Sequence, residues 1–297
     1  MSLKRLFKRN THNFFFRALG DFGIAMIRFY ENRNHDIYSN GELTLIRKLT
    51  KLSPSLVIDG GANTGNYSLM VNRFCGDAKI LSFEPVEQTF NILKENTKDS
   101  ERIKPVRKGL FSSDATKKIN IFPLNTHSSI YDIKGLPYDR TASVSINMTT
   151  GDSVMKEYGI NYIDLLKLDL EGAEYEALKG FSKAFENKQI RMIQFEYGYI
   201  NITTRKLLLY FYEFFEQYGY IIGKVFPKTV EFRPYKFKYE DFTGPNFVAV
   251  HKDDLVLRNL IEKNCKGTGI KTGQIRLATV KPINHPLLSA VKTRACS

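Results

Sequence analysis

The stretch 56–67, which reads LVIDGGANTGNY, constrains the fold of this chain more than any other part of it. A short apolar run of β-formers ends at Asp59, and apolar residues recur at helical spacing a few positions later. Between them stand Gly60, Gly61 and Gly65. This order predicts a buried strand, a tight turn and a helix, the opening unit of a nucleotide-binding α/β sheet.

Glycine serves such a turn in two ways, because it adopts backbone angles closed to other residues and lets a ligand approach the main chain. The start of the next helix offers unpaired N–H groups to that ligand. Dinucleotide-binding turns follow the pattern G-x-G-x-x-G. Here two adjacent glycines follow an aspartate and the third comes four residues later. The spacing therefore disfavours an NAD-dependent dehydrogenase, and a plain βα turn without a ligand is the other alternative.

A second carboxylate stands at the end of the next predicted strand. The segment 79–85, KILSFEP, places Glu84 twenty-five residues after Asp59, and Pro85 ends the strand. An acidic residue at about this distance, at the end of the second strand, accepts hydrogen bonds from the ribose hydroxyls of a nucleotide. An isolated glutamate at a strand end is usually only solvated, but the preceding turn favours the ribose role for Glu84.

Further carboxylates follow two later strands. The segment 163–174, IDLLKLDLEGAE, ends its apolar part at Asp169 and continues through Glu171 into a turn and a helix. The run 190–197 ends with Glu196 followed by a tyrosine. Open α/β sheets bind their ligands at the carboxyl ends of the strands. We therefore expect Asp169, Glu171 and Glu196 to lie at the ligand-binding edge of the sheet.

Charge is unevenly distributed along the 297 residues, which carry a net charge of +13. Residues 1–51 hold ten Lys/Arg against four Asp/Glu, and residues 252–297 hold nine against three, so the middle is nearly neutral. We interpret 1–51 as a helical N-terminal extension, 52–251 as the main domain and 252–297 as a basic C-terminal tail. The basic ends are either solvated segments or contacts for an anionic surface.

The N-terminal extension shows two rough apolar faces, over 19–29 and 43–49, which we interpret as packing against the main domain. A basic amphipathic helix on a membrane surface is the alternative. The chain has no apolar run of transmembrane length and no evident signal peptide. Cys75, Cys265 and Cys296 are too dispersed for a zinc knuckle or a disulfide framework, so we expect a reducing, cytoplasmic location, with peripheral membrane contact as the alternative.

Residues 102–111 are predicted to form a third strand. Between it and the segment 163–174, residues 112–150 include runs in which apolar and polar residues alternate, which predicts a β-rich insertion. Its polar loop contains His127, which alone indicates nothing specific. Two final strands are predicted at 220–222 and 247–250, and the Gly-, Lys- and Thr-rich segment from residue 264 is predicted to be partly disordered.

Three motifs in this order resemble the FkbM-type S-adenosylmethionine-dependent methyltransferases. They are the turn DGGANTG at 59–65, the triplet FEP at 83–85 and the run IDLLKLDLEGAE at 163–174. The similarity covers about residues 42–251, and the combination is specific where a single motif is not. Family members often carry three alternating glycines in the turn. Here Asn63 takes the middle place, and asparagine tolerates the left-handed angles this position would need.

The resemblance implies an α/β, class I methyltransferase (Rossmann-like) fold, with a seven-stranded sheet, helices on both faces and a final antiparallel strand. It implies S-adenosylmethionine as cofactor, with its methionine part at the glycine turn and its ribose at Glu84. It places Asp169 beside the methionine ammonium or the acceptor hydroxyl. The expected cofactor-binding residues are Asp59, Gly60, Gly61, Asn63, Gly65, Asn66, Tyr67, Glu84, Pro85 and Asp169.

Characterised members of this family mostly methylate hydroxyl groups, so the resemblance implies O-methylation of a sugar, a glycan or a small natural product. A hydroxyl is a poor nucleophile, so for this reaction we expect Asp169 or Glu171 to act as a general base, supported by Glu196. A divalent metal held by the three carboxylates is the alternative. A nucleic-acid methyltransferase is the first alternative, prompted by the basic ends. Enzymes that methylate exocyclic amines carry Asp/Asn-Pro-Pro-aromatic after the fourth strand, whereas residues 169–172 read DLEG, so no nucleic-acid partner is expected. A non-catalytic cofactor-binding scaffold at an anionic surface is the second alternative, and Asp59, Glu84 and Asp169 argue against it.

Overall fold

The computed structural model describes residues 8, 11–122, 128–133, 135 and 139–262. The first of two compact units of the chain, 1–264, contains all of them. His127, Cys265, Cys296 and the predicted disorder from residue 264 lie outside the described residues.

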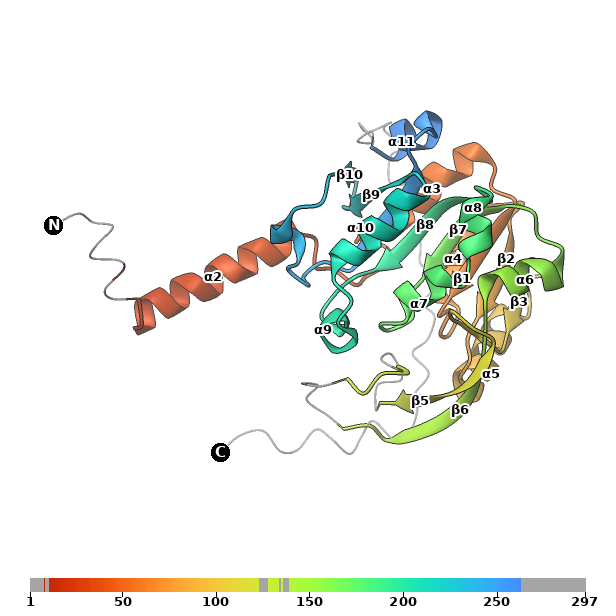
Figure 1. The fold of residues 1–297 in the computed structure, drawn as a ribbon, viewed down its shortest axis with the longest axis horizontal. Helices are drawn as coiled ribbons and strands as arrows, with labels where there is room; N and C mark the ends of the chain where they lie inside the picture. The colour runs from red at the N-terminus through yellow and green to blue at the C-terminus, as the bar shows by residue number, and fades with distance from the viewer. Residues whose placement is uncertain (1–7, 9–10, 123–127, 134, 136–138, 263–297) are drawn as a thin grey trace, which may run out of the picture. The chain divides into compact units, whose positions relative to one another are not determined.

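A central sheet of eight strands organises this unit, in the order β10-β9-β11-β8-β7-β1-β2-β3 (Figure 1). Its strands are β1 (Leu56–Gly60), β2 (Lys79–Phe83), β3 (Ile103–Val106), β7 (Ile163–Leu168), β8 (Ile190–Glu196), β9 (Tyr220–Val225), β10 (Val230–Phe232) and β11 (Asn246–His251). β3, β2, β1, β7 and β8 run parallel to one another, and β11 lies antiparallel between β8 and β9. The predicted mostly parallel α/β sheet and its antiparallel last strand are therefore confirmed.

The predicted number of seven strands is wrong by one. β10 pairs antiparallel with β9 and adds an eighth strand at the edge of the sheet. It has only three residues, Val230–Phe232, and is joined to β9 by a short turn in which the N–H of Phe226 and the carbonyl of Thr229 are bonded. A segment this short shows no usable alternation of apolar and polar residues, which is why the sequence pattern does not reveal it.

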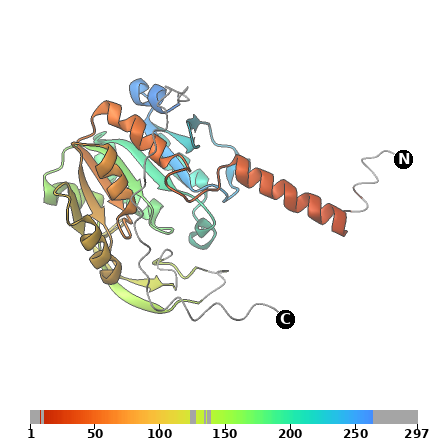
Figure 2. The same ribbon diagram turned by 180° about the vertical axis from the view of Figure 1, so that it is seen from behind.

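Helices cover both faces of the sheet (Figures 1 and 2). They are α3 (Glu42–Leu49), α4 (Asn66–Phe74), α5 (Glu87–Thr97), α6 (Gly151–Tyr158), α7 (Glu174–Lys179), α8 (Ser182–Glu186), α9 (Ile200–Thr204), α10 (Leu208–Gln217) and α11 (Leu255–Glu262), with 3₁₀ turns η1 (Thr50–Leu52) and η2 (Phe237–Tyr239). Apolar residues of α6, α7, α8 and α10 pack on one face, and those of α3, α4 and α11 pack on the other. The predicted two-faced coverage is confirmed.

Aromatic rings dominate the first of these two cores. Phe195 of β8 stacks on Phe211 of α10, with ring centroids 5.0 Å apart and planes 3° from parallel. Phe185 of α8 packs edge-on against Phe215, again on α10. Such pairs each add about 0.5–1.5 kcal/mol beyond area burial. The aromatic stripe of α10 is thus core, as its helical spacing predicts, and it fixes the position of β8, which ends at Glu196.

The predicted β-rich insertion forms a separate three-stranded sheet, in the order β4-β6-β5. Its strands are β4 (Gly109–Leu110), β5 (Ala115–Ile121) and β6 (Ala142–Thr149). β5 and β6 form an antiparallel pair, and β4 pairs parallel with the end of β6. β4 directly follows β3 along the chain, so the segment 102–111, predicted as one strand, divides between two sheets.

The N-terminal extension has two parts that differ in burial. In α3, Leu45, Ile46 and Leu49 are buried against the sheet, as predicted. The preceding helix α2 (Phe14–Tyr30) has no buried residue, so the prediction that the whole extension packs on the main domain is wrong for α2. Among the described helices, none is long and apolar enough to cross a membrane.

The C-terminal boundary also differs from the sequence interpretation. Leu257 and Ile261 of α11 are fully buried beside α3. The Lys48 ammonium donates to the carbonyl of Ile261 at 2.8 Å and ties the two helices together. Residues 252–262 therefore belong to the folded body, not to the tail as predicted.

Candidate functional site

The glycine turn between β1 and α4 lies directly against the turn after β7. Gly61 has φ +80°, and a Cβ placed there would stand 1.8 Å from the carbonyl oxygen of Asp169. Asn63 has φ +48° and Gly65 has φ +94°, so all three positions use left-handed angles. Glycine, and to a lesser extent asparagine, accepts these angles at low cost. The unusual residue order therefore has a structural cause, the close approach of two backbones at the end of the sheet.

The turn after β7 is held by its own carboxylate and by the insertion. Glu174 Oε1 accepts hydrogen bonds from the N–H groups of Leu170 and Gly172, at 2.7 and 3.3 Å. Ser129, beside β5, donates its hydroxyl to the carbonyl of Glu171 at 2.7 Å. Glu171 itself has φ +48°. A non-glycine residue at such an angle is uncommon and costs free energy, and the surrounding bonds hold the backbone of this turn in that conformation.

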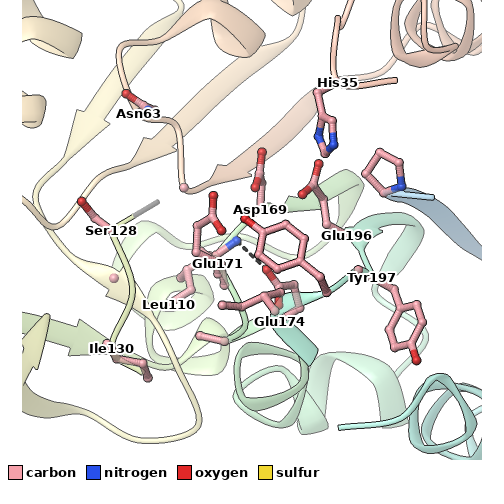
Figure 3. A pocket seen from close by; sticks show the side chains of 18 of the residues that line it. His35, Asn63, Leu110, Ser128, Ile130, Asp169, Glu171, Glu174, Glu196 and Tyr197 are labelled. Carbon is pink, nitrogen blue, oxygen red and sulfur yellow. Dashed lines mark hydrogen bonds between the residues drawn. The ribbon is translucent and has the colours of Figure 1, made fainter. Parts of the chain in front are cut away.

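A cavity of about 760 Å³ opens at the carboxyl ends of β1, β2, β7 and β8. This volume lies in the range of small-molecule and cofactor sites. Its wall is formed by the two turns, the strand ends, the insertion, the segment that leads into α3, and the segments 197–200 and 242–245. Figure 3 shows Asp169, Glu171, Glu174 and Glu196 gathered around it, with His35 facing Glu196. Asp169, Glu171 and Glu196, predicted from separate stretches of sequence, thus meet at one site.

A buried lysine stands among these carboxylates. Lys167 Nζ lies 2.9 Å from Asp169 Oδ2 and 4.7 Å from the centre of the Tyr67 ring. Burial alone would lower the pKa of Lys167, but the charges of Asp169, Asp59 and Glu42 raise it above the ordinary value. The lysine is therefore charged, and it offsets part of the negative charge of the cavity wall.

Burial and mutual repulsion act on the remaining carboxyl groups. The pKa of Glu171 is raised well above its ordinary value by burial and then by the charges of Asp169 and Glu174. The pKa of Glu196 is raised well above its ordinary value by burial and by Asp169. The shifts favour the protonated form of both groups, and a protonated carboxyl group can donate a hydrogen bond. A bound cation would reverse this shift, since it favours the ionised carboxylate.

Glu84, the predicted ribose ligand, lines the cavity from the end of β2. Its Oε1 accepts a hydrogen bond from the N–H of Val86 at 2.9 Å. Burial raises the pKa of Glu84 to about 7, against the effect of backbone hydrogen bonds from Val86 and Asn63. The carboxyl group is thus pre-positioned at the mouth of the glycine turn, where a ligand bound there would meet it.

The predicted cofactor residues fall into two sets. Those that line the cavity are Gly61, Asn63, Glu84, Pro85 and Asp169. Those that are absent from its lining are Asp59, Gly60, Gly65, Asn66 and Tyr67.

The residues of the second set lie behind the cavity lining and hold the elements that form it. Asp59 is fully buried and accepts a hydrogen bond from the Ser68 hydroxyl at 2.6 Å, which ties β1 to α4. The Tyr67 hydroxyl donates to Gln194 at 2.9 Å, and the Gln194 amide donates to Glu42 at 2.6 Å. These bonds hold the first turn of α4 and the start of α3 together.

Sequence reasoning missed the residues that the N-terminal segment supplies. Arg33, His35 and Glu42 line the cavity, although they precede the region of family resemblance or stand at its edge. Burial and the neighbouring Arg33 lower the pKa of His35, against the attraction of Asp169. Lys167 was also given no role on the basis of the sequence. A charged residue inside an otherwise apolar strand signals nearby carboxylates, because an unpaired buried charge is too costly.

Among the residues that the structure describes, no group of three or more His, Cys, Asp or Glu side chains is arranged to hold a metal ion.

The sequence match agrees with the geometry. The family described as the Methyltransferase FkbM domain matches residues 59–222, more than half of the chain. This chain belongs to the FkbM methyltransferase family. The match begins at Asp59, directly before the glycine turn, and includes every carboxylate at the strand ends described above. S-adenosylmethionine is the methyl donor throughout this family, and it is the cofactor of this methyltransferase.

The curated relatives that the chain matches are distant. The "Methyltransferase sdnD" of Sordaria araneosa is 31% identical over 157 residues, which are 43% of this chain and 61% of sdnD. The "Hexuronic acid methyltransferase AglP" of Haloferax volcanii is 26% identical over 57% of this chain and 68% of AglP. The chain thus spans less than two thirds of the length of sdnD and about two thirds of that of AglP. A crystal structure of an FkbM methyltransferase from Methylobacillus flagellatus KT is similar over 66% of this chain and 44% of its own, at 15% identity and a TM-score of 0.43.

The residues present fit S-adenosylmethionine. Carboxyl groups from several strand ends line the cavity, which suits a cationic ligand that carries a sulfonium and an ammonium group. The cavity also has apolar residues from the insertion side, Leu110, Ile146 and Met148, which suit an adenine ring. Gly61 and Asn63 of the glycine turn line the same cavity.

Proposed function

We propose that this enzyme methylates a hydroxyl oxygen of a sugar, a glycan or a small polyhydroxylated natural product. The observation that carries the proposal is the convergence of Asp169, Glu171 and Glu196 on one cavity, at the ends of β7 and β8. A hydroxyl group is a poor nucleophile, and a positioned carboxylate that accepts its proton raises its reactivity. The printed name of one relative, a hexuronic acid methyltransferase, supports a sugar acceptor.

In this proposal the glycine turn and Glu84 hold the cofactor, which supplies a methyl group on a positively charged sulfur. Glu84 accepts hydrogen bonds from the ribose hydroxyls, and the wall at Leu110 and Met148 receives the adenine. These residues and the strand-end carboxylates orient the two reactants in line, and positioning of this kind supplies much of the rate of a transfer reaction.

In this proposal the carboxyl groups have different roles, according to whether they are ionised or protonated. Asp169 is ion-paired with Lys167 through Oδ2, and we assign it the acceptance of the hydroxyl proton. Glu171 and Glu196, with raised pKa values, donate hydrogen bonds to acceptor oxygens. His35, which faces Glu196, and Arg33 also line the cavity, and we assign to them contacts with the acceptor.

Methyl transfer to defined acceptors tests the proposal. The full chain is incubated with S-adenosylmethionine and a panel of neutral sugars, uronic acids and small phenols or polyols. Mass spectrometry then detects a gain of one CH₂ group per acceptor, and fragmentation locates it on oxygen. Asp169→Asn serves as the matched inactive control. Methylation confined to nitrogen acceptors, or to nucleic acid, would contradict the proposal.

A further inference from the structure

Helix α2 presents an unusually apolar surface to solvent. Its sequence is FFFRALGDFGIAMIRFY, and none of its residues is buried. Phe14 is 87% exposed, Phe22 62% and Phe29 78%. Large apolar side chains exposed together mark a surface that binds another molecule or a membrane.

The few charged residues of α2 share one narrow stripe. At 3.6 residues per turn, Arg17, Asp21 and Arg28 fall within about 40° of one another around the helix axis. Large apolar side chains, among them Leu19 and Phe22, occupy most of the rest of the circumference. A helix with one thin polar edge and a wide apolar face lies in the plane of a membrane interface, with the apolar side sunk toward the acyl chains.

The charge of the neighbouring sequence indicates which kind of surface would bind this helix. Lys4, Arg5, Lys8 and Arg9 precede α2, and the first twenty residues contain no Asp or Glu. A second copy of the chain would bring the same positive charges together, whereas an anionic bilayer would attract them, at about 1 kcal/mol per residue near the surface. With 17 residues, α2 is not among the helices that could cross a membrane, and none of the described helices is.

We propose that α2 binds the surface of an anionic lipid bilayer, lying in the plane of the headgroups, and so holds this enzyme at a membrane. This inference concerns membrane binding alone and does not depend on which acceptor is methylated.

The C-terminal end of α2 is fixed to the catalytic body, so a bound helix would position the whole domain. Glu31, which caps the helix, pairs with Arg233 at 3.1 Å, and both side chains are buried. The Asn32 amide donates to the carbonyl oxygens of Asn40 and Val225 at 2.7 and 3.1 Å. The next few residues then reach the cavity wall at His35. The membrane-bound helix would therefore lead directly to the acceptor side of the cavity.

Vesicle co-sedimentation of the full chain tests the proposal without cofactor or acceptor. Vesicles of phosphatidylcholine with about one quarter phosphatidylglycerol are compared with phosphatidylcholine alone. We expect the wild type to partition onto the anionic vesicles, and to do so less at high salt because salt screens the attraction. The double variant Leu19→Glu/Phe22→Glu should lower the partition coefficient by roughly 100-fold or more, since two apolar side chains no longer enter the bilayer.

Two matched variants separate the helix from general effects. Phe237→Glu changes another aromatic side chain, 86% exposed on η2, and should leave binding unchanged. Leu19→Met/Phe22→Leu keeps the apolar face and should bind as the wild type does. Equal binding to neutral and anionic vesicles, or wild-type binding by the double glutamate variant, would overturn the proposal. So would a light-scattering result in which α2 holds two copies together and no vesicles are bound.

Discussion

The ammonium of Lys167 lies 2.9 Å from the carboxylate of Asp169, two residues farther along the chain. The lysine side chain is 5% exposed and the aspartate 33%, so the pair joins the buried interior of the sheet to the cavity wall. The same ammonium is near Asp59, Glu42 and Glu196, whose charges raise its pKa. Lys167 is thus the shared counter-charge of carboxylates contributed by the N-terminal segment and by three different strands.

Replacement of Lys167 by methionine should destabilise the fold. The substitution keeps the length of the side chain and leaves Asp59, which is fully buried, without a neighbouring cation. We expect a loss of about 2–4 kcal/mol in the free energy of unfolding, below the range for a fully buried pair because Asp169 is partly exposed. Urea unfolding at pH 7 measures this loss, and a value under about 1 kcal/mol would show that the carboxylates are stable without the lysine.

Gly61→Ala should disrupt both turns at once. The added Cβ would stand 1.8 Å from the Asp169 carbonyl oxygen, and the position has φ +80°. Left-handed angles alone cost a non-glycine residue about 1–2 kcal/mol, and the collision adds to this. Gly76→Ala is the matched control, since nothing lies within 4 Å of its Cβ position. We expect the first variant to lose both stability and cofactor affinity, measured by thermal unfolding and calorimetry, while the control loses neither.

Glu84→Gln should change stability in a pH-dependent way. Because folding raises the pKa of Glu84 from 4.5 to about 7, the group stabilises the protein below its unfolded pKa and loses that contribution as the pH rises through 7. Glutamine resembles the protonated form. At pH 8 the variant should therefore be more stable than the wild type, by up to about 3 kcal/mol, and at pH 5 nearly equal to it. Urea unfolding at both pH values checks this, and an equal difference at pH 5 and pH 8 would contradict it.

The same variant should bind S-adenosylmethionine more weakly. An ionised carboxylate accepts hydrogen bonds from ribose hydroxyls more strongly than an amide does, and the loss of such a bond costs about 1.5–3 kcal/mol. Titration calorimetry at pH 8, where Glu84 is ionised, should show this loss, with less of it at pH 6. Unchanged affinity at pH 8 would remove Glu84 from the ribose site.

The strand–turn–helix units were predictable because their signals are local. Runs of β-formers end at Asp59, Glu84 and Asp169, and parallel strands place such residues at one edge of the sheet. The contribution of His35 was not predictable, because its place in the cavity depends on how α3 packs more than a hundred residues away from the strands that complete the site. The exposure of α2 was missed for a similar reason. Its apolar content resembles that of a core helix, and only the structure shows that no described residue covers it.

His35→Gln should affect the acceptor and not the cofactor. The imidazole enters the cavity from the N-terminal segment, opposite the glycine turn, and faces Glu196. Loss of one hydrogen bond to the acceptor is expected to raise its KM by roughly 2–10-fold. Calorimetry of S-adenosylmethionine binding provides the control, and a cofactor affinity that falls as far as acceptor KM rises would place His35 on the cofactor side.

Asp169→Asn should separate catalysis from binding. The substitution keeps the shape of the side chain and removes the charge that pairs with Lys167 and the oxygen that would accept the hydroxyl proton. If Asp169 is the base, methyl transfer at saturating acceptor should fall by roughly 10²–10⁴-fold, the usual contribution of general acid–base catalysis. Cofactor affinity should change much less, because Glu84 and the glycine turn are intact. Stopped-flow or quenched single turnovers give the rate, and calorimetry gives the affinity. An affinity that falls as far as the rate would make Asp169 a cofactor ligand and leave the base to Glu171 or Glu196. If neither quantity changes, the carboxylate serves only to hold Lys167, and the proposed proton transfer to Asp169 is wrong.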